Sequence, residues 1–368
     1  MKNSKHKGDH IPVAHDSNRG FTIIELLIAI VIFLIVTSSI YGLLSLGTVS
    51  KNRASFRTDV LKNARAAVHL IGRDALNAGL GYHQAGALVP NGFLSSTLGL
   101  PPDVDNQRDI LTSVIAGNDL FDNDLQGTSG NKTDIVAFAF RDLDYNAGDA
   151  IAISKSKNGA AATTTRLELG ASTTSSIKPY DLLLVEADTT QVAVMASKII
   201  DSKNVDFETS DPLNINLARN GSGIDRSLLT KCTSTITDNC TGQLSAMKRF
   251  YWVSYKVKDD GTLVRITYGN NTGKPLDEQV QELPLAYNVK DLQFTYVLEN
   301  GTVTDNPGAG PDGIAGTSDD TPNNFNLIRQ ISVMIEVQST ERDIQTNEPI
   351  TITLRGTFST RNLEYDVG

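Results

Sequence analysis

The chain has 368 residues, enough for one large domain or two small ones. Hydrophobic residues make up 40% of the chain and charged residues 20%, as in folded proteins, which excludes disorder throughout. The apolar residues are concentrated in one place rather than repeated along the chain, which excludes a protein with many membrane spans. The formal net charge of −9 gives no electrostatic basis for binding nucleic acid, so that class of partner is excluded.

A polar, basic segment and an apolar run open the chain. Residues 1–20 carry four basic and two acidic side chains, and the 20 residues from Phe21 to Ile40 contain a single charge, Glu25. As a helix that rises about 1.5 Å per residue, this run would span roughly 30 Å, the thickness of a bilayer core. The basic flank predicts one membrane span with a cytoplasmic N-terminus, although basic residues at 51–57 weaken the asymmetry.

The apolar run differs from that of a secretory signal peptide. It is longer than a signal sequence, and no Ala-x-Ala cleavage site follows it. The small residue Gly20 stands before the run instead. This order predicts cleavage on the cytoplasmic side, after which the mature protein keeps its hydrophobic segment.

Glu25 is the one charge inside the run. A carboxylate near the end of a spanning helix costs about 2–3 kcal/mol unless it reaches the interface or finds a partner. Two interpretations are open: a glutamate tolerated at the membrane interface, or a charge that pairs with the newly freed amine of Phe21 on an adjacent subunit.

The segment GFTIIELL, residues 20–27, resembles the prepilin signature of type IV pilins and type II secretion pseudopilins. The resemblance implies that a prepilin peptidase cleaves between Gly20 and Phe21, which makes residues 1–20 a leader peptide, and N-methylates Phe21. It also implies that Glu25 aids subunit recruitment and register during assembly.

The helical pattern continues past the apolar run, and no proline occurs between Phe21 and Pro90. Apolar residues at three- and four-residue steps predict a helix from 21 to about 80 with an apolar stripe along one face. The charged residues of 51–80 are expected to lie off this stripe. The stripe contains Phe56, Val60, Ala64, Ala67, Ile71 and Ala75. We predict a stalk over 21–85 with its membrane-spanning part at 21–40, and the resemblance implies that its second half packs on a globular head.

The end of this helix carries a second resemblance. Asp74, Ala78 and Gly79 match the Asp-x-x-x-Ala-Gly stretch that closes the helix in PilW-type minor pilins and the related J-type pseudopilins. Gly79 and Gly81 are expected to form the C-terminal cap. A generic helix end without subfamily information is the alternative.

Residues 86–368 predict a β-rich head, because short apolar runs alternate there with Gly, Asn, Asp, Ser and Thr. The ten predicted strands are 134–140, 150–154, 165–170, 181–187, 191–200, 249–257, 262–269, 292–298, 328–338 and 350–358. Asp-Gly at 260–261 predicts a tight hairpin, and Trp252 is expected in the core rather than in a ligand platform. With no second amphipathic helix expected, the fold class is α+β: a long N-terminal helix on a mainly antiparallel sheet.

Several of these runs also resemble PilW-like proteins in their order along the chain. TDIVAFAF and PYDLLLVEA resemble two strands of that family. The stretch RFYWVSYKVKDDGTLVRITYG, followed by FSTRNLEY, resembles the end shared by PilW-like and J-type proteins. The resemblance covers the first eighty residues closely and the head loosely.

Cysteine and histidine usage limits the chemistry of the head. The two cysteines, Cys232 and Cys240, can close a small disulfide loop worth roughly 2.5 kcal/mol in the chain-entropy model. Without a nearby histidine they cannot complete a four-ligand zinc site. All five histidines lie within the first 83 residues, so the head has little means for common hydrolytic catalysis.

The segment 300–325 is rich in aspartate and glycine. Asp312, Asp319 and Asp320 are the candidate calcium ligands, with Asp305 nearby, because oxygen ligands on a flexible loop suit Ca²⁺. The spacing does not fit an EF-hand. A solvated acidic loop without metal is the alternative.

Our leading hypothesis is a PilW-like minor pilin that acts in type IV pilus assembly and priming near the filament tip. We do not expect it to be an enzyme. The resemblance implies the prepilin peptidase, other minor and major pilins, and the inner-membrane assembly platform as partners. It implies an inner-membrane location before assembly, then a pilus location with the head in the periplasm or outside.

Two alternatives stay open. A J-type minor pseudopilin of a type II secretion system shares the same N-terminal chemistry. A signal-anchored enzyme or binding protein is the remote alternative, and the head lacks the GxSxG, Walker A, HExxH and CxxC patterns that would favour an enzyme.

Overall fold

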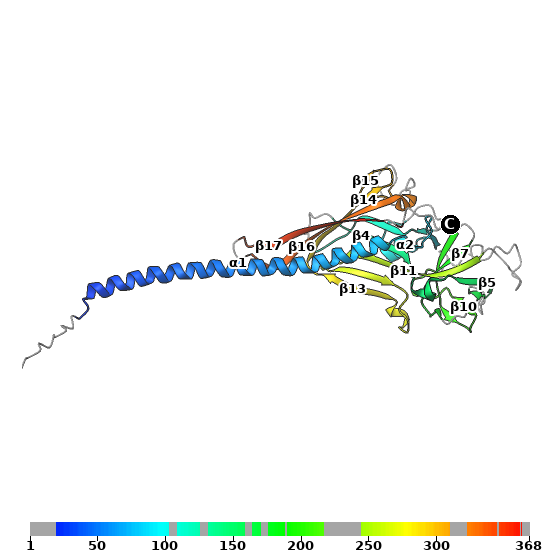
Figure 1. Ribbon diagram of the computed structural model, residues 1–368, viewed down its shortest axis with the longest axis horizontal. Helices are drawn as coiled ribbons and strands as arrows, with labels where there is room; N and C mark the ends of the chain where they lie inside the picture. Colours follow the sequence, from blue (N-terminus) through cyan, green and yellow to red (C-terminus); the bar gives the residue numbers. More distant parts are fainter. Residues whose placement is uncertain are drawn as a thin grey trace, which may run out of the picture. The chain divides into compact units, whose positions relative to one another are not determined.

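The described residues form one long helix and two β-sheets in the computed structural model of Figure 1. The structure describes residues 20–102, 109–125, 132–158, 164–170, 176–187, 190–216, 244–309, 322–343, 346–360 and 362. Two compact units divide the chain, Met1–Ser55 and Phe56–Gly368. Helix α1 (Ile23–Asn77) starts in the first unit and ends in the second.

Two left-handed glycines follow α1. Gly79 has a φ of 81° and Gly81 a φ of 60°, conformations that glycine adopts without strain. The Gly79 N–H donates to the Ala139 carbonyl at 3.0 Å, which ties the helix end to the sheet. The left-handed conformation expected of both glycines is therefore confirmed, but the Gly79 N–H bonds to the sheet instead of capping a helix carbonyl. The helix ends at Asn77 rather than near residue 80, and residues 78–85 form turns and irregular chain.

Thirteen strands form the first sheet: β1 (Ala87–Val89), β2 (Asp109–Leu111), β3 (Val114–Phe121), β4 (Thr133–Arg141), β5 (Ile151–Asn158), β6 (Thr165–Leu169), β7 (Leu182–Ala187), β8 (Thr190–Met195), β9 (Lys198–Ile199), β10 (Asn204–Phe207), β11 (Leu244–Val257), β12 (Leu263–Tyr268) and β13 (Val280–Ala286). The main path is β2-β1-β8-β7-β11-β5-β6-β10-β9. Strand β11 also pairs with β4 and β12, which bring β3 and β13 into the sheet. Every pairing is antiparallel except β1 with β8.

The second sheet has four strands in the order β15-β14-β16-β17. Their bounds are β14 (Val289–Leu298), β15 (Val303–Thr304), β16 (Ile328–Arg342) and β17 (Pro349–Ser359). A short helix, α2 (Phe93–Leu98), and three 3₁₀ turns, η2 (Tyr145–Gly148), η4 (Leu276–Glu278) and η5 (Pro322–Leu327), complete the described elements.

The second half of α1 packs on both sheets. Ala64, Ala67, Ile71 and Ala75 are buried in one cluster with residues of β4, β11, β14 and β16. Small side chains bring the helix close to the strands, and a Cβ at Gly72 would overlap the ring of Phe358 on β17. Within the second unit, α1 lies beside β16 and β17 on one side and β13 on the other (Figure 1). The predicted apolar stripe is confirmed.

Each of the ten predicted strand segments overlaps at least one strand of the structure. The segment 191–200 is divided between β8 and β9. The β11–β12 hairpin is confirmed by the bond from Lys258 N to Thr262 O, at 2.9 Å, and Trp252 is fully buried as predicted. The prediction omitted α2 and six strands: β1, β2, β3, β10, β13 and β15.

Candidate functional site

The start of α1 presents an accessible peptide bond. Gly20 and Phe21 precede the first helical turn, and both are exposed, the Phe21 side chain by 88%. Nothing lies within 4 Å of the position that a Cβ on Gly20 would take. The bond predicted to be cleaved is therefore outside the helix, where a peptidase can reach the backbone.

Thr22 and Glu25 form a reciprocal cap at this helix start. Glu25 Oε2 accepts hydrogen bonds from the Thr22 backbone N–H at 3.0 Å and from the Thr22 hydroxyl at 2.9 Å. The Glu25 N–H in turn donates to Thr22 Oγ1 at 3.3 Å. This is a capping box, in which the first and fourth residues of the turn satisfy each other's backbone groups. Glu25 thus has a partner in its own chain, a possibility that our two sequence-based interpretations did not include.

The apolar residues that follow the cap have no apolar partner among the described residues of their own unit, 20–55. The large apolar side chains from Ile23 to Leu46 are mostly 47–86% exposed. By length and composition, α1 is the one helix among the described residues that is apolar enough to cross a membrane. Exposed apolar surface of this extent calls for lipid or for other apolar helices around it.

A buried charged cluster lies under the second half of α1. Asp74 is 1% exposed, and its Oδ2 accepts from the Tyr255 hydroxyl at 2.6 Å and from Arg265 Nε at 2.8 Å. Arg73 donates to the other oxygen, Oδ1, at 3.1 Å. Burial, followed by the Asp74 charge, raises the pKa of Tyr255 far above its ordinary value. The expectation that all charges of 51–80 lie off the packed face was therefore wrong for Asp74, whose charge two arginines offset.

A second buried carboxylate links the two sheets. Asp134 of β4 accepts from the backbone N–H of Asp119 at 2.8 Å and from that of Phe294, on β14, at 2.7 Å. Burial raises the pKa of Asp134 to about 7, and the charges of Asp119 and Asp291 act in the same direction, although both backbone bonds oppose the shift. Asp134 therefore holds the sheets together through a group that titrates near neutral pH.

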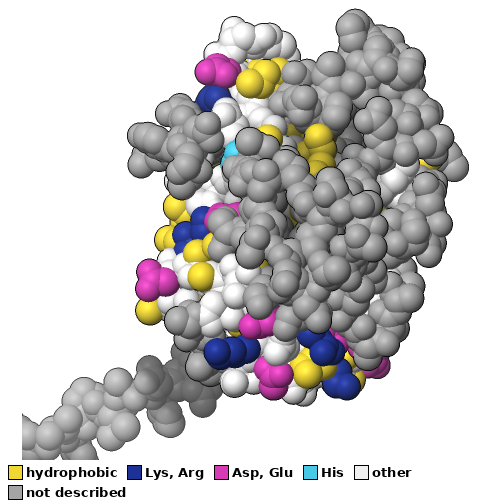
Figure 2. Space-filling model, turned by 90° about the vertical axis from the view of Figure 1, so that its right-hand side faces the viewer, with side chains coloured by type: hydrophobic (Ala, Val, Ile, Leu, Met, Phe, Trp, Pro, Cys, Tyr) yellow, Lys and Arg dark blue, Asp and Glu magenta, His cyan; other side chains and the backbone are white. Residues whose placement is uncertain are grey.

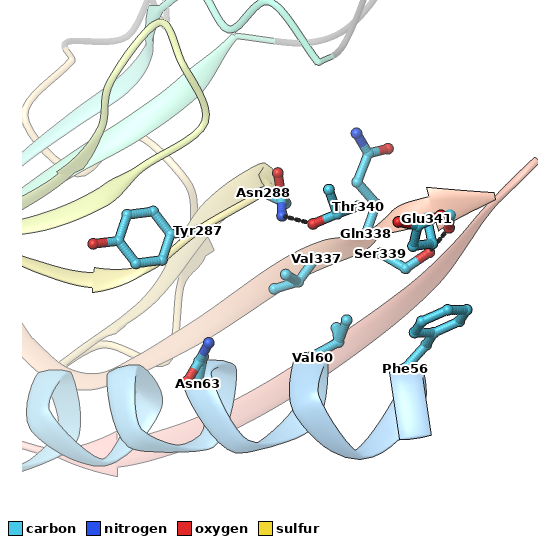
Figure 3. A pocket seen from close by; sticks show the side chains of 10 residues that line it. All are labelled: Phe56, Val60, Asn63, Tyr287, Asn288, Val337, Gln338, Ser339, Thr340 and Glu341. Carbon is cyan, nitrogen blue, oxygen red and sulfur yellow. Dashed lines mark hydrogen bonds between the residues drawn. The ribbon is translucent and has the colours of Figure 1, made fainter. Parts of the chain in front are cut away.

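A groove of about 230 Å³ lies between α1 and the end of β16 (Figure 3). Its lining comprises Phe56, Val60, Asn63, Tyr287, Asn288, Val337, Gln338, Ser339, Thr340 and Glu341. Phe56, Val60 and Asn63 project from α1 toward the strand, and Asn288 Nδ2 donates to Thr340 Oγ1 at 2.9 Å. The groove combines apolar contacts with neutral hydrogen-bonding groups and a single carboxylate.

The predicted calcium and disulfide residues lie outside the described residues. These are Asp312, Asp319 and Asp320 for calcium, and Cys232 and Cys240 for the disulfide, so both remain predictions. Among the described residues, no group of three or more His, Cys, Asp or Glu side chains is placed to hold a metal ion. On the face shown in Figure 2, the described basic and acidic side chains are interspersed rather than gathered by charge.

Sequence reasoning brought Gly20, Phe21 and Glu25 together but missed Thr22. The pattern Thr-x-x-Glu directly before an apolar run is the sequence signature of a capping box, so it was visible. Sequence reasoning also missed the roles of Asp74 and Asp134, whose hydrogen-bond partners are distant in sequence.

Two comparisons with known proteins bear on this helix start. A family model described as the prokaryotic N-terminal methylation motif matches residues 16–41. No curated protein matches the chain. The motif match, with the exposed apolar helix behind it, supports a structural protein of the type IV pilin-like or pseudopilin-like kind, processed by a prepilin peptidase and assembled with pilins. The same features are consistent with anchoring in the inner membrane.

Proposed function

We propose that the chain is a PilW-like minor pilin that acts in type IV pilus assembly and priming, near the filament tip. The observation that carries this proposal is the helix start: a methylation motif at residues 16–41 on a capped, exposed apolar helix. The α+β head that follows the helix supports a pilin-like subunit, and its sequence resemblance to PilW-like proteins supports the finer assignment.

In this proposal a prepilin peptidase cleaves between Gly20 and Phe21 and methylates the new amine. The amine then lies one residue before Thr22, whose side chain and backbone already hold the Glu25 carboxylate. Removing a charge from water is costly without an opposite charge nearby. Glu25 of one subunit therefore pairs with the Phe21 amine of a neighbour as the apolar helices bundle, and mispaired helices leave both charges without a partner.

The size of the head favours a minor rather than a major subunit. Residues 86–368 comprise 283 residues on a single helix. A subunit repeated along a filament must fit between neighbours on all sides, whereas a subunit at the tip has few neighbours around its head. A bulky head is therefore best accommodated at the tip.

The alternative is a J-type minor pseudopilin of a type II secretion system. The resemblance of β11, β12 and the chain end is shared by both families, so it supports this second candidate as well as the first. Both candidates use the same processing and the same Glu25 pairing, and they differ in the machine that the subunit primes.

Deletion of the gene in the native host separates the two candidates. A minor pilin predicts loss of surface pili, restored by the wild-type gene, with protein secretion intact, and traces of the chain in sheared filaments. Normal piliation with lost secretion would assign the chain to type II secretion instead. Intact piliation and intact secretion together would contradict both assignments.

A further inference from the structure

The outer face of α1 in the second unit carries a row of basic and histidine side chains. Lys62, Arg65, His69 and Arg73 stand at intervals of three, four and four residues, which places them along one line of the helix. All four are exposed, and they lie opposite the buried stripe that faces the sheets. We call this row the basic ridge.

Acidic residues flank the ridge but do not occur within it: Asp59 stands three residues before Lys62 in the sequence, and Asp74 directly follows Arg73. Residues 60–73 contain no acidic side chain, and neither Lys62 nor Arg65 forms an ion pair with a described residue. Arg73 pairs with Asp74, whose side chain lies on the buried side of the helix. Like charges at a three-residue interval repel each other and weaken a helix. This repulsion is relieved when an acidic surface covers the ridge.

The rest of the head has the opposite charge. Residues 74–368 contain 23 basic and 38 acidic side chains, a net charge of −15. An extended anionic surface such as a lipid bilayer would attract the ridge but repel the head beside it. A narrow acidic strip on a protein can contact the ridge without approaching the acidic remainder of the head. Charge complementarity therefore favours a protein partner over a membrane.

We propose that the basic ridge docks a row of carboxylates on a neighbouring pilin-like subunit in the assembled filament or priming complex. The inference rests on the proposed function, since it takes its partner from the assembly. From Lys62 to Arg73 the ridge extends roughly 16 Å along the helix, the length of a three-turn helix or a five-residue strand. A partner with acidic residues repeated along such an element satisfies the whole ridge at once.

Site-specific photocrosslinking in cells identifies the partner. The full chain carries a photoreactive amino acid at Arg65, and a control carries it at Lys203, another exposed basic residue, in a bend of the head. We expect Arg65 to crosslink to a pilin-like subunit, a second copy of this chain included, and Lys203 to give less of that product. In isolated membranes the Arg65 product should decrease as salt is raised, because salt screens exposed charges. Crosslinking of Arg65 to phospholipid instead, or equal yields at both sites, would overturn the proposal.

Charge reversal gives the quantitative test. Lys62→Glu with Arg65→Glu should lower the amount of the chain in sheared filaments about tenfold, while the control pair Lys198→Glu with Lys203→Glu, which makes the same change of charge elsewhere, has little effect. Unchanged leader removal and thermal unfolding in both variants would show that the fold is intact. If the ridge variant enters filaments as the wild type does, the ridge proposal is wrong and the pilin assignment stands. If the wild type itself never enters filaments, the proposed function fails first.

Discussion

The two halves of α1 both carry large apolar side chains, but the surroundings of these side chains are opposite. Ile35, in the first unit, is 61% exposed, whereas Ile71, in the second, is fully buried against two sheets. The helix itself is continuous from Ile23 to Asn77. What differs is the partner: strands of the same chain cover the apolar stripe of the second half, whereas no described residue of the first unit covers the first half.

This difference separates folding from assembly within one helix. The apolar stripe of the second half packs on its own head and needs no neighbour in order to fold, and only the outer face of this half carries the basic ridge. The first half keeps its apolar side chains free for a bilayer or for other helices, and its only described side-chain partnership at the start is the Thr22–Glu25 cap. Substitutions in the two halves should therefore act on different measurable properties.

The largest expected effect is on leader removal. Gly20→Ala places a side chain beside the bond to be cleaved, and we expect processing to be lost, so that the chain keeps residues 1–20. The matched control is Gly47→Ala in the same unit, where a Cβ also meets nothing within 4 Å, and it should be processed normally. Intact mass distinguishes the two forms. Normal cleavage of the Gly20 variant would disprove the assigned site.

A matched pair of isoleucines gives the next largest effect. Ile71→Ala should lower the free energy of unfolding of the head by about 2–5 kcal/mol, because it leaves a cavity between helix and sheets. Ile35→Ala removes the same atoms from an exposed position and should leave head stability unchanged. Thermal unfolding of the full chain in detergent measures both. Equal losses would mean that the head also depends on the first half of α1.

Three substitutions at the helix start separate the cap from the charge. Glu25→Ala should permit cleavage but weaken incorporation into filaments. Glu25→Gln keeps the capping hydrogen bonds and loses only the charge, so it should weaken incorporation as much if the charge is what incorporation requires. Thr22→Val removes the side-chain half of the cap, worth about 1 kcal/mol, and should retain most incorporation. Quantifying the chain in sheared filaments ranks the three. Wild-type behaviour of Glu25→Gln would assign Glu25 a capping role alone.

The smallest expected effect is a change with pH in the stability of the head, caused by Asp134. The pKa of Asp134, about 7 when folded, is above its ordinary value of 3.8, so the folded chain binds more protons between these values. The contribution of Asp134 to stability therefore grows as pH falls from about 7 toward 4. Asp134→Asn should cost more stability near pH 5 than near pH 8, as measured by denaturant unfolding.

The exposed Asp201 provides a control, because its contribution to stability should depend on pH in the opposite direction. A backbone hydrogen bond from Lys203 and a side-chain bond from Asn204 lower the pKa of the exposed Asp201. Its contribution is lost as pH falls through the ordinary carboxyl range, so the cost of Asp201→Asn should shrink with acid. A cost of Asp134→Asn that does not change with pH would contradict the role given to the buried carboxylate.

Local pattern was enough to predict much of this fold. The stripe on α1, the left-handed glycines after it and the strands with alternating or continuous apolar runs are each determined within a few residues of chain. Strand β13 was missed because Val280–Ala286 is exposed over most of its length and contains a proline, so its pairing with β12 rather than burial holds it.

The charges on packed surfaces could not be predicted in the same way. Asp74 is buried because Tyr255 and Arg265, 181 and 191 residues later in the chain, meet its carboxylate. Asp134 depends on a backbone N–H 160 residues away. At the helix start the opposite holds, since Gly20, Phe21, Thr22 and Glu25 are neighbours in sequence. That site was therefore predictable from the sequence, including the cap, although the cap was missed.

The most direct test of the account is the intact and N-terminal peptide mass of the protein from its native membrane. We expect a mature chain that begins at Phe21 with one added methyl group on its amine, which is what a pilin-like subunit requires. A chain that retains residues 1–20 in cells with an active prepilin peptidase would contradict the account, and a plain signal anchor would then explain the apolar half of α1.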